Sequence, residues 1–152
     1  MKASVSLSKI GRCYRGEKVR AYIYIIYSKL QHAAYVGQTN DQNGALSRLC
    51  GHLGQNGTFG NRLLERQGIY TYEIEDLTMF TFCLPDEASY IGRESSYREG
   101  VEYLVQIQLR TIALTPFLHI VSQVRYNDTA SLPFVKLMAK DVLDAFTEAY
   151  NN

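Results

Sequence analysis

A run of seven consecutive apolar or aromatic residues constrains the fold of this chain more than any other feature. Residues 21–27 read AYIYIIY and contain three β-branched isoleucines. Residues of this kind favour β-strands, and an unbroken apolar run predicts a strand that is buried on both faces. A second short run, AAYVG at residues 33–37, follows after a polar turn. Because the two runs are so close along the chain, we expect them to pair as an antiparallel hairpin.

The rest of the chain predicts one further strand and several helices. Residues 70–83 alternate between apolar and polar side chains, which indicates a third strand. Apolar residues at helical spacing predict helices over about residues 45–53, 61–66, 95–113 and 134–145. We therefore expect an α+β fold, with a small antiparallel sheet of three strands flanked by helices.

Charge is distributed unevenly. Residues 1–20 contain six basic side chains against the single acid Glu17, a net charge of +5, so the other 132 residues sum to −4 in a total of +1. We interpret residues 1–19 as a basic N-terminal arm. Such an arm could bind phosphate, although a solvated terminus would look the same. The overall charge argues neither for nor against a nucleic-acid partner.

Cysteine and hydropathy patterns exclude several classes of protein. The three cysteines (Cys13, Cys50 and Cys83) are far apart in the sequence. This spacing fits neither a zinc ribbon nor a disulfide framework, and a reducing compartment is the simplest setting. No apolar run approaches the roughly 18 residues that a membrane span needs. The start of the chain also lacks the apolar segment of a secretory signal. We expect a cytoplasmic protein with no membrane partner.

Several short motifs resemble, in order, those of the GIY-YIG nuclease family. Tyr22-Ile23-Tyr24 and Tyr35-Val36-Gly37 resemble the paired signature of the family hairpin. The later matches are polar residues, each on or next to a predicted element: Arg48, His52, Asn61, Glu102, and Asn127 in the pair Tyr126-Asn127. The resemblance covers residues 20–128, which we interpret as a small stand-alone nuclease domain. Residues 129–152 then form a C-terminal helix that packs on this domain or at an interface.

The resemblance implies a divalent-metal-dependent endonuclease that acts on DNA. It implies Tyr35 as general base, Arg48 as the stabiliser of phosphate charge, and Glu102 as the ligand of Mg²⁺ or Mn²⁺. A single carboxylate is a sufficient anchor for Mg²⁺ when phosphate and water complete its shell. Tyr24 and His52 would relay a proton or orient Tyr35. The expected substrate-binding residues are Asn61, Asn127, Gln38 and Arg20.

The sequence also departs from the family pattern. Tyr22 stands where the family usually has glycine, and the stretch from Glu102 to Asn127 is longer than usual. Gln106 or Arg110 could therefore fill the role of Asn127. Without the resemblance, the tyrosines could be sheet packing, and Arg48 and Glu102 a surface ion pair worth under about 1 kcal/mol.

Other functions remain open at this point. The chain could be a DNA-binding module that has lost turnover, or a nuclease toxin or effector that a protein inhibitor neutralises. Cleavage of both DNA strands would be simplest for a homodimer, because one active site serves one strand. The helix over residues 134–145 is a candidate interface, and core packing explains its apolar face equally well. The sequence does not distinguish DNA from RNA or define a target site.

Overall fold

The predicted hairpin is confirmed and lies at the centre of the molecule. The computed structural model describes residues 20–54, 56–92 and 96–152, so the basic arm of residues 1–19 lies outside the described residues. Strands β1 (Tyr22–Ser28) and β2 (Ala33–Thr39) pair in antiparallel fashion. Every residue of β1 is buried, as its unbroken apolar sequence predicts.

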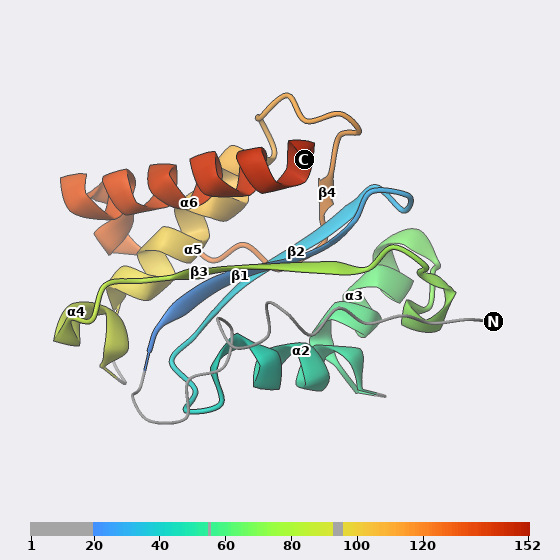
Figure 1. Cartoon of the computed structure of the whole chain (residues 1–152), viewed down its shortest axis with the longest axis horizontal. Coiled ribbons are helices and arrows are strands. Elements are labelled where there is room, and N and C mark those ends of the chain that lie inside the picture. The colour runs from blue at the N-terminus through green and yellow to red at the C-terminus, as the bar shows by residue number, and fades with distance from the viewer. Residues whose placement is uncertain (1–19, 55, 93–95) are drawn as a thin grey trace.

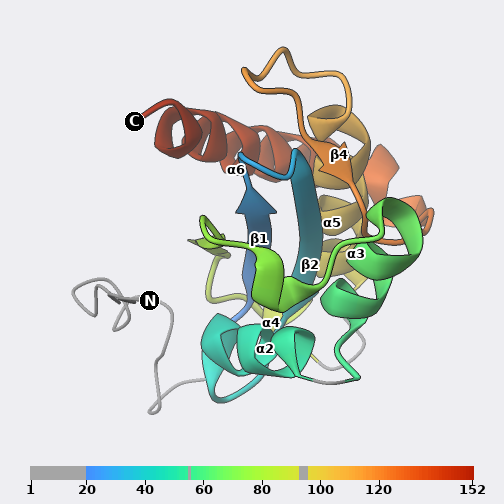
Figure 2. The same cartoon turned by 90° about the vertical axis from the view of Figure 1, so that its right-hand side faces the viewer.

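The sheet has four strands of mixed direction. Strand β3 (Thr78–Cys83) pairs antiparallel to β1, and β4 (His119–Ile120) pairs parallel to β2, giving the order β3-β1-β2-β4. Figure 2 shows β4 beside one end of β2. The expected α+β class is confirmed, but the expected sheet of three antiparallel strands is wrong. A two-residue strand is too short for an alternating pattern to reveal it.

The first half of the predicted third strand is not a strand. Residues Thr71–Glu73 form a 3₁₀ turn (η1), and the side chain of Tyr72 is 80% exposed. The Glu73 carboxylate accepts a hydrogen bond of 2.8 Å from the backbone N–H of Tyr70. This local bond competes with a strand ladder, and the strand begins only at Thr78.

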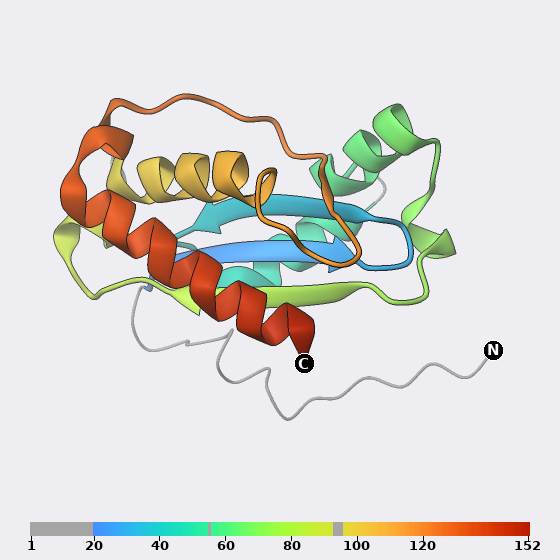
Figure 3. The ribbon, with the colours of Figure 1, turned by 90° about the horizontal axis from the view of Figure 1, so that it is seen from above.

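Helices cover both faces of the sheet. In Figure 1, α5 and α6 lie above the sheet, and α2 and α3 lie below it. Seen from above in Figure 3, α6 crosses the sheet diagonally while α5 runs alongside β2. The helices are α2 (Gly44–Leu53), α3 (Thr58–Gln67), the short α4 (Ala88–Ile91), α5 (Ser96–Leu109) and α6 (Pro133–Asn151). None of these described helices combines the length and apolarity needed to cross a membrane.

Three helix boundaries differ from those expected. Helix α3 begins at Thr58 rather than at residue 61, and α5 ends at Leu109 rather than near residue 113. Helix α6 begins at Pro133 and extends to Asn151, beyond the expected end at residue 145. Proline suits the first helical position because its fixed φ is already helical and its missing N–H has no partner to lose. A 3₁₀ turn, η2 (Asp128–Ser131), precedes α6.

The sheet separates two hydrophobic cores. Alternate residues of β1 point to opposite faces, so Ile23, Ile25 and Tyr27 pack under α5 and α6, in the larger cluster. Tyr22, Tyr24 and Ile26 belong to the smaller cluster, which lies between the sheet and helices α2 and α3. The apolar face of α6 belongs to the larger core. Both faces of β1 are therefore used in packing.

Candidate active site

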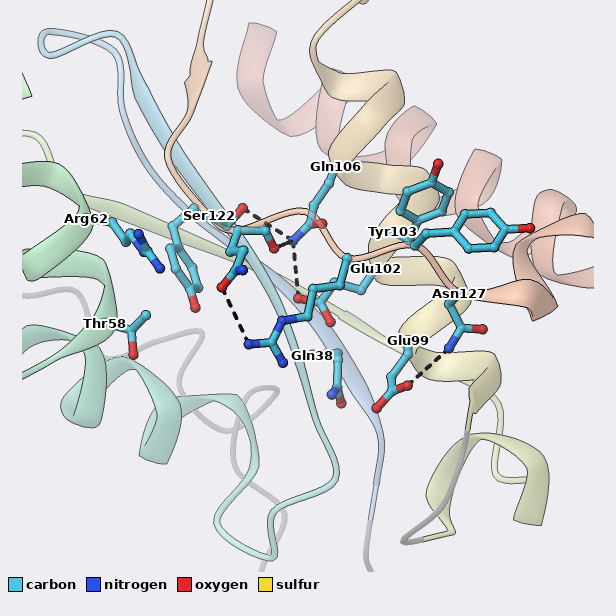
Figure 4. Close-up of a pocket in the computed structure, with 13 residues that line it drawn as sticks. Gln38, Thr58, Arg62, Glu99, Glu102, Tyr103, Gln106, Ser122 and Asn127 are labelled. Carbon is cyan, nitrogen blue, oxygen red and sulfur yellow. Dashed lines mark hydrogen bonds between the residues drawn. The ribbon is translucent and has the colours of Figure 1, made fainter. Parts of the chain in front are cut away.

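A cleft of about 410 Å³ opens at the edge of β2. Strand β4 pairs with only the first two residues of β2, so in the described part of the chain no strand covers the rest of that edge. Tyr35 and Gln38 of β2 line the cleft between Thr58 and Arg62 of α3 and the side chains of α5. The segment over residues 122–127 completes the wall (Figure 4). The cleft therefore joins elements from both faces of the sheet.

The amide of Gln106 fixes the distance between α5 and the open edge of β2. Its Nε2 lies 3.3 Å from a carboxylate oxygen of Glu102 and 3.4 Å from the backbone oxygen of Val36. It is also 3.4 Å from Ser122 Oγ and from the backbone oxygen of Gln123. Ser122 Oγ in turn accepts a bond of 3.2 Å from the N–H of Val36. Side chains thus satisfy the N–H and C=O of Val36 on the strand edge that β4 leaves open.

Glu102 carries the most perturbed carboxylate of the cleft. Burial, and then the charge of Glu99 one helical turn earlier, raise the pKa of Glu102 to about 7. The guanidinium groups of Arg125, Arg98 and Arg48 act in the opposite direction. Glu99 and Glu102 both line the cleft. Two crowded carboxylates, one of them poorly hydrated, favour the arrival of a proton or a cation.

The buried side chains of Tyr24 and His52 form a cluster with the half-buried Tyr35 on the α2 side of the sheet. The hydroxyl of Tyr24 and Nε2 of His52 are 2.7 Å apart in a buried hydrogen bond. The ring of His52 also contacts the ring of Tyr35, with centroids 4.6 Å apart. Burial, and then the charge of Arg48, lower the pKa of His52 to about 4. His52 is therefore neutral at pH 7 and connects the two tyrosines.

Both tyrosines are protonated at neutral pH. Burial raises the pKa of Tyr24, and the Arg48 guanidinium beside its hydroxyl opposes this rise. Burial and then the Glu102 charge raise the pKa of Tyr35, while Arg48, Arg62 and Arg125 lower it. Three guanidinium groups thus favour the phenolate form of Tyr35. The same groups would favour an anionic phosphate in the cleft.

Gly37 leaves the space that the Tyr24 ring occupies. The two residues lie opposite each other in the hairpin. A Cβ added at Gly37 would lie 2.3 Å from the Tyr24 hydroxyl oxygen and 2.4 Å from its ring carbon Cζ. Any side chain at residue 37 would therefore push the Tyr24 hydroxyl away from His52. The glycine is needed for close approach here.

The structure places the five expected catalytic residues in three environments. Tyr35 and Glu102 line the cleft itself. Tyr24 and His52 are buried, at 1% and 5% exposure, and contact Tyr35 through His52. Arg48 is an exposed residue of α2, one turn before His52, and its charge acts on Tyr24, Tyr35 and Glu102. The charges of Arg48 and Glu102 both act on the two tyrosines, and two of the five residues line the cleft.

Two of the expected substrate-binding residues line the cleft, but protein groups already engage both. Gln38 Oε1 accepts a hydrogen bond from Nε of Arg98. Asn127 caps η2 by accepting from the N–H of Thr129 at 3.0 Å, and it donates to Glu99 at 3.1 Å. Both amides therefore position the walls of the cleft as well as facing it.

The other two expected substrate-binding residues do not line the cleft. Asn61 was expected to open the second helix, but Thr58 opens it and lines the cleft in place of Asn61, which is an exposed residue one turn later. Arg20 pairs with Asp86, beyond the end of β3, at 3.0 Å. This ion pair belongs to the opposite edge of the sheet from β2. Neither residue is placed to contact a substrate there.

Sequence reasoning missed several residues of the cleft. Glu99 precedes Glu102 by three residues, and that spacing puts two side chains on one helical face, so it could have been found. Arg62 follows Thr58 by four residues in the same way. Arg125 comes from a segment without secondary structure, where no periodicity predicts its position. Of the two substitutes considered for Asn127, Gln106 lines this cleft, whereas Arg110 lines a different hollow.

Oxygen donors for a cation come from the α5 wall of the cleft. Glu99 and Glu102 are its two carboxylates. Among the described residues no group of three or more histidine, cysteine, aspartate or glutamate side chains is arranged to enclose a metal ion. A cation here would thus need substrate or water oxygens to complete its shell, which is the usual situation for Mg²⁺ at phosphate sites.

Comparison of the chain with models of protein families, with curated proteins and with solved structures gave no significant match.

Proposed function

We propose that this chain is a divalent-metal-dependent endonuclease that hydrolyses phosphodiester bonds in DNA at the cleft on the edge of β2. One observation carries the proposal: Tyr35 from the hairpin and Glu102 from α5 line a single cleft, and the charge of Arg48 acts on both. The resemblance of the hairpin sequence to the GIY-YIG signature supports the same activity.

The donor set of the cleft fits Mg²⁺ or Mn²⁺. Both ions prefer carboxylate oxygens and share their shell with substrate phosphate and water. Burial and Glu99 keep the pKa of Glu102 raised although Arg125, Arg98 and Arg48 act to lower it, so the charge of this carboxylate is only partly compensated. A bound cation would complete that compensation and would neutralise the phosphate and the leaving oxygen.

Arg48 and Arg62 are suited to hold the phosphate. A guanidinium never loses its charge at neutral pH and donates in a planar fork that matches phosphate oxygens. Arg62 lines the cleft, with one Nη 3.0 Å from the exposed Glu65. Arg48 lies close enough to perturb both tyrosine hydroxyls. Together they place positive charge where negative charge develops on the non-bridging oxygens.

Tyr35 is assigned the role of general base. Its pKa is raised by burial, so it must first pass its own proton to solvent before it can accept one from the attacking water. Arg48, Arg62 and Arg125 favour the phenolate that results. The neutral His52, in contact with the Tyr35 ring and bonded to Tyr24, holds the tyrosine in place.

Tyr22, the residue that replaces the family glycine, does not favour the alternative of an inactive binding module. Its ring is 1% exposed and packs in the core beneath α2 and α3. Tyr22 does not line the cleft. The substitution therefore leaves the space for a phosphate open.

Cleavage of supercoiled plasmid DNA tests the proposal. The wild-type protein is incubated with Mg²⁺ or Mn²⁺ beside Glu102→Gln, Arg48→Gln and a charge-matched control, Glu148→Gln, at an exposed site on α6. We expect nicked or linear product from the wild type and the control, and a loss of about 10²-fold or more in the other two variants. Equal cutting by all four proteins, or none by the wild type with either metal, would contradict the proposal.

A further inference from the structure

A second hollow, of about 600 Å³, lies next to the cleft along the same two segments of the chain. Arg66 and Gln67 at the end of α3 form one wall, and Arg110 lies just beyond the end of α5. The segment over residues 117–121, which contains β4, forms the remainder. The lining includes two arginines and His119 but no carboxylate.

The hollow and the cleft are consecutive along α3. Arg62 lines the cleft, and Arg66, one turn later on the same helical face, lines the hollow. Four residues of helix correspond to about 6 Å along its axis. The two sites are also consecutive along the opposite wall, because residues 118–121 line the hollow and Ser122 begins the wall of the cleft. A chain of phosphates leaving the cleft along α3 would therefore meet Arg66 next.

The cations of the hollow are available for a ligand. None of the ion pairs among the described residues involves Arg66 or Arg110, and both side chains are exposed. Arg66 donates one bond, of 3.3 Å, to the backbone oxygen of Ile120, which leaves its other donors open. The amide oxygen of Gln67 is buried with no hydrogen-bond partner in the described structure.

An aromatic side chain accompanies these charges. Phe117 lines the hollow, is 43% exposed, and contacts the ring of His119 edge-on with centroids 5.3 Å apart. Exposed aromatic rings beside guanidinium groups are typical of surfaces that bind nucleic-acid strands, because bases stack on the rings while the cations hold phosphates.

We propose that this hollow binds the DNA backbone on one side of the cleaved phosphate, with Arg66 and Arg110 contacting phosphates and Phe117 contacting a base. The inference rests on the proposed function, because it takes the cleft as the place of the reacting phosphate. It adds to that function a direction for the bound strand: from the cleft, along α3, across the end of the sheet at β4.

Binding of labelled oligonucleotides of increasing length tests the inference. Affinity is measured without divalent metal, so that the strand stays intact, for strands of about 4 and about 16 nucleotides. We expect the wild type to bind the longer strand at least about tenfold more tightly, because it reaches both sites. In Arg66→Gln/Arg110→Gln this preference should largely disappear, and the slope of log affinity against log salt should fall by about 1.5 to 2.

Two further variants control for a general loss of positive charge and for a folding defect. Lys136→Gln/Lys140→Gln removes the same charge from exposed sites on α6 and should leave the preference for the longer strand unchanged. Arg110→Gln alone removes an exposed side chain that forms no hydrogen bond or ion pair within the part of the chain that the structure describes, so a folding defect is not expected, and this variant should show about half of the decrease in salt slope. If the wild type prefers the longer strand and the hollow variants do so equally, the inference is wrong and the proposed function stands. If the wild type binds both strands equally, or binds neither, the inference is wrong, and the cleavage assay with Mg²⁺ or Mn²⁺ decides the proposed function separately.

Discussion

The two faces of the sheet use the same strand for different purposes. On the α5 and α6 side, β1 contributes Ile23, Ile25 and Tyr27 to a large aliphatic and aromatic core. On the α2 and α3 side, it contributes Tyr22 and Tyr24 to a smaller cluster, where the Tyr24 hydroxyl bonds to His52. The difference shows that the first face mainly stabilises the fold and the second mainly positions polar groups. The cleft lies at the edge of β2, where helices from both faces meet.

Substitution in the larger core should give the largest effect, and on stability alone. Phe146 is fully buried and contacts the rings of Tyr27, Phe80 and Tyr150. We expect Phe146→Ala to lower the free energy of unfolding by about 3–5 kcal/mol, measured by urea denaturation. Activity per folded molecule should be unchanged. A loss of activity in the fully folded variant would contradict the claim that the α5 and α6 face of the sheet only stabilises the fold.

Substitution of Arg48 should lower activity and have little effect on stability, the reverse of the result expected for Phe146. Arg48 is exposed on α2, and its guanidinium lies beside the Tyr24 hydroxyl, so Arg48→Gln should lower the free energy of unfolding by no more than about 1 kcal/mol. The rate of DNA cleavage should fall by about 10²-fold, equivalent to about 2.7 kcal/mol of transition-state stabilisation. Single-turnover cleavage and urea denaturation of the same preparation measure both quantities. If Arg48→Gln loses stability but keeps its rate of DNA cleavage, Arg48 contributes to the fold and not to the reaction.

We expect the ionised carboxylate of Glu102 to lower the free energy of unfolding at high pH. Burial raises its pKa from 4.5 to about 7, so folding disfavours the ionised form. Wild-type stability therefore falls as pH rises from about 4.5 to about 7, and the full penalty is present above that range. Glu102→Gln should be more stable than wild type by up to about 3 kcal/mol at pH 8 and equally stable at pH 4.

Thermal denaturation across this pH range, with and without Mg²⁺, measures the effect of Glu102. The cation should stabilise the wild type at pH 8 and leave Glu102→Gln unaffected, since binding to the folded state alone raises stability. Equal stabilisation of both proteins would remove Glu102 from the metal site.

The Tyr24 hydroxyl should have the smallest effect. Tyr24→Phe keeps the buried ring and removes one hydrogen bond to His52. We expect a loss of about 1 kcal/mol in the free energy of unfolding and a severalfold lower cleavage rate, because His52 and then Tyr35 lose a fixed position. Substitution of Tyr27, on the other face, by phenylalanine provides the matched control and should not alter the rate. Equal rates for both variants and the wild type would show that the hydroxyl has no part in the reaction.

Local sequence predicted the hairpin and the helix that carries Arg48 and His52, because both have dense and regular apolar patterns. It did not predict β4, because His119 of β4 pairs with Ala33 of β2, which lies 86 positions earlier in the chain, and only the tertiary fold brings the two together. Residues 70–77 alternate like a strand, but Glu73 bonds back to Tyr70 and forms a turn instead.

Which residues line the cleft was predicted in part, for the same reason. Tyr35 and Glu102 are on regular elements, and the structure brings both to the cleft. Glu99 shares a helical face with Glu102 and was within reach of sequence reasoning. Arg125 lies on an irregular segment, and its position depends on contacts between distant parts of the chain. Arg20 has an acidic partner, Asp86, that no sequence pattern indicates.

The position of the cation tests the account most directly. Crystals grown with Mn²⁺ and a short DNA strand carrying a non-cleavable phosphorothioate would locate the ion by its anomalous scattering. We predict one strong peak within about 2.0–2.3 Å of a Glu102 carboxylate oxygen, with the phosphate between it and Tyr35. A manganese ion bound with the DNA phosphate at any site away from Glu102 would contradict the account.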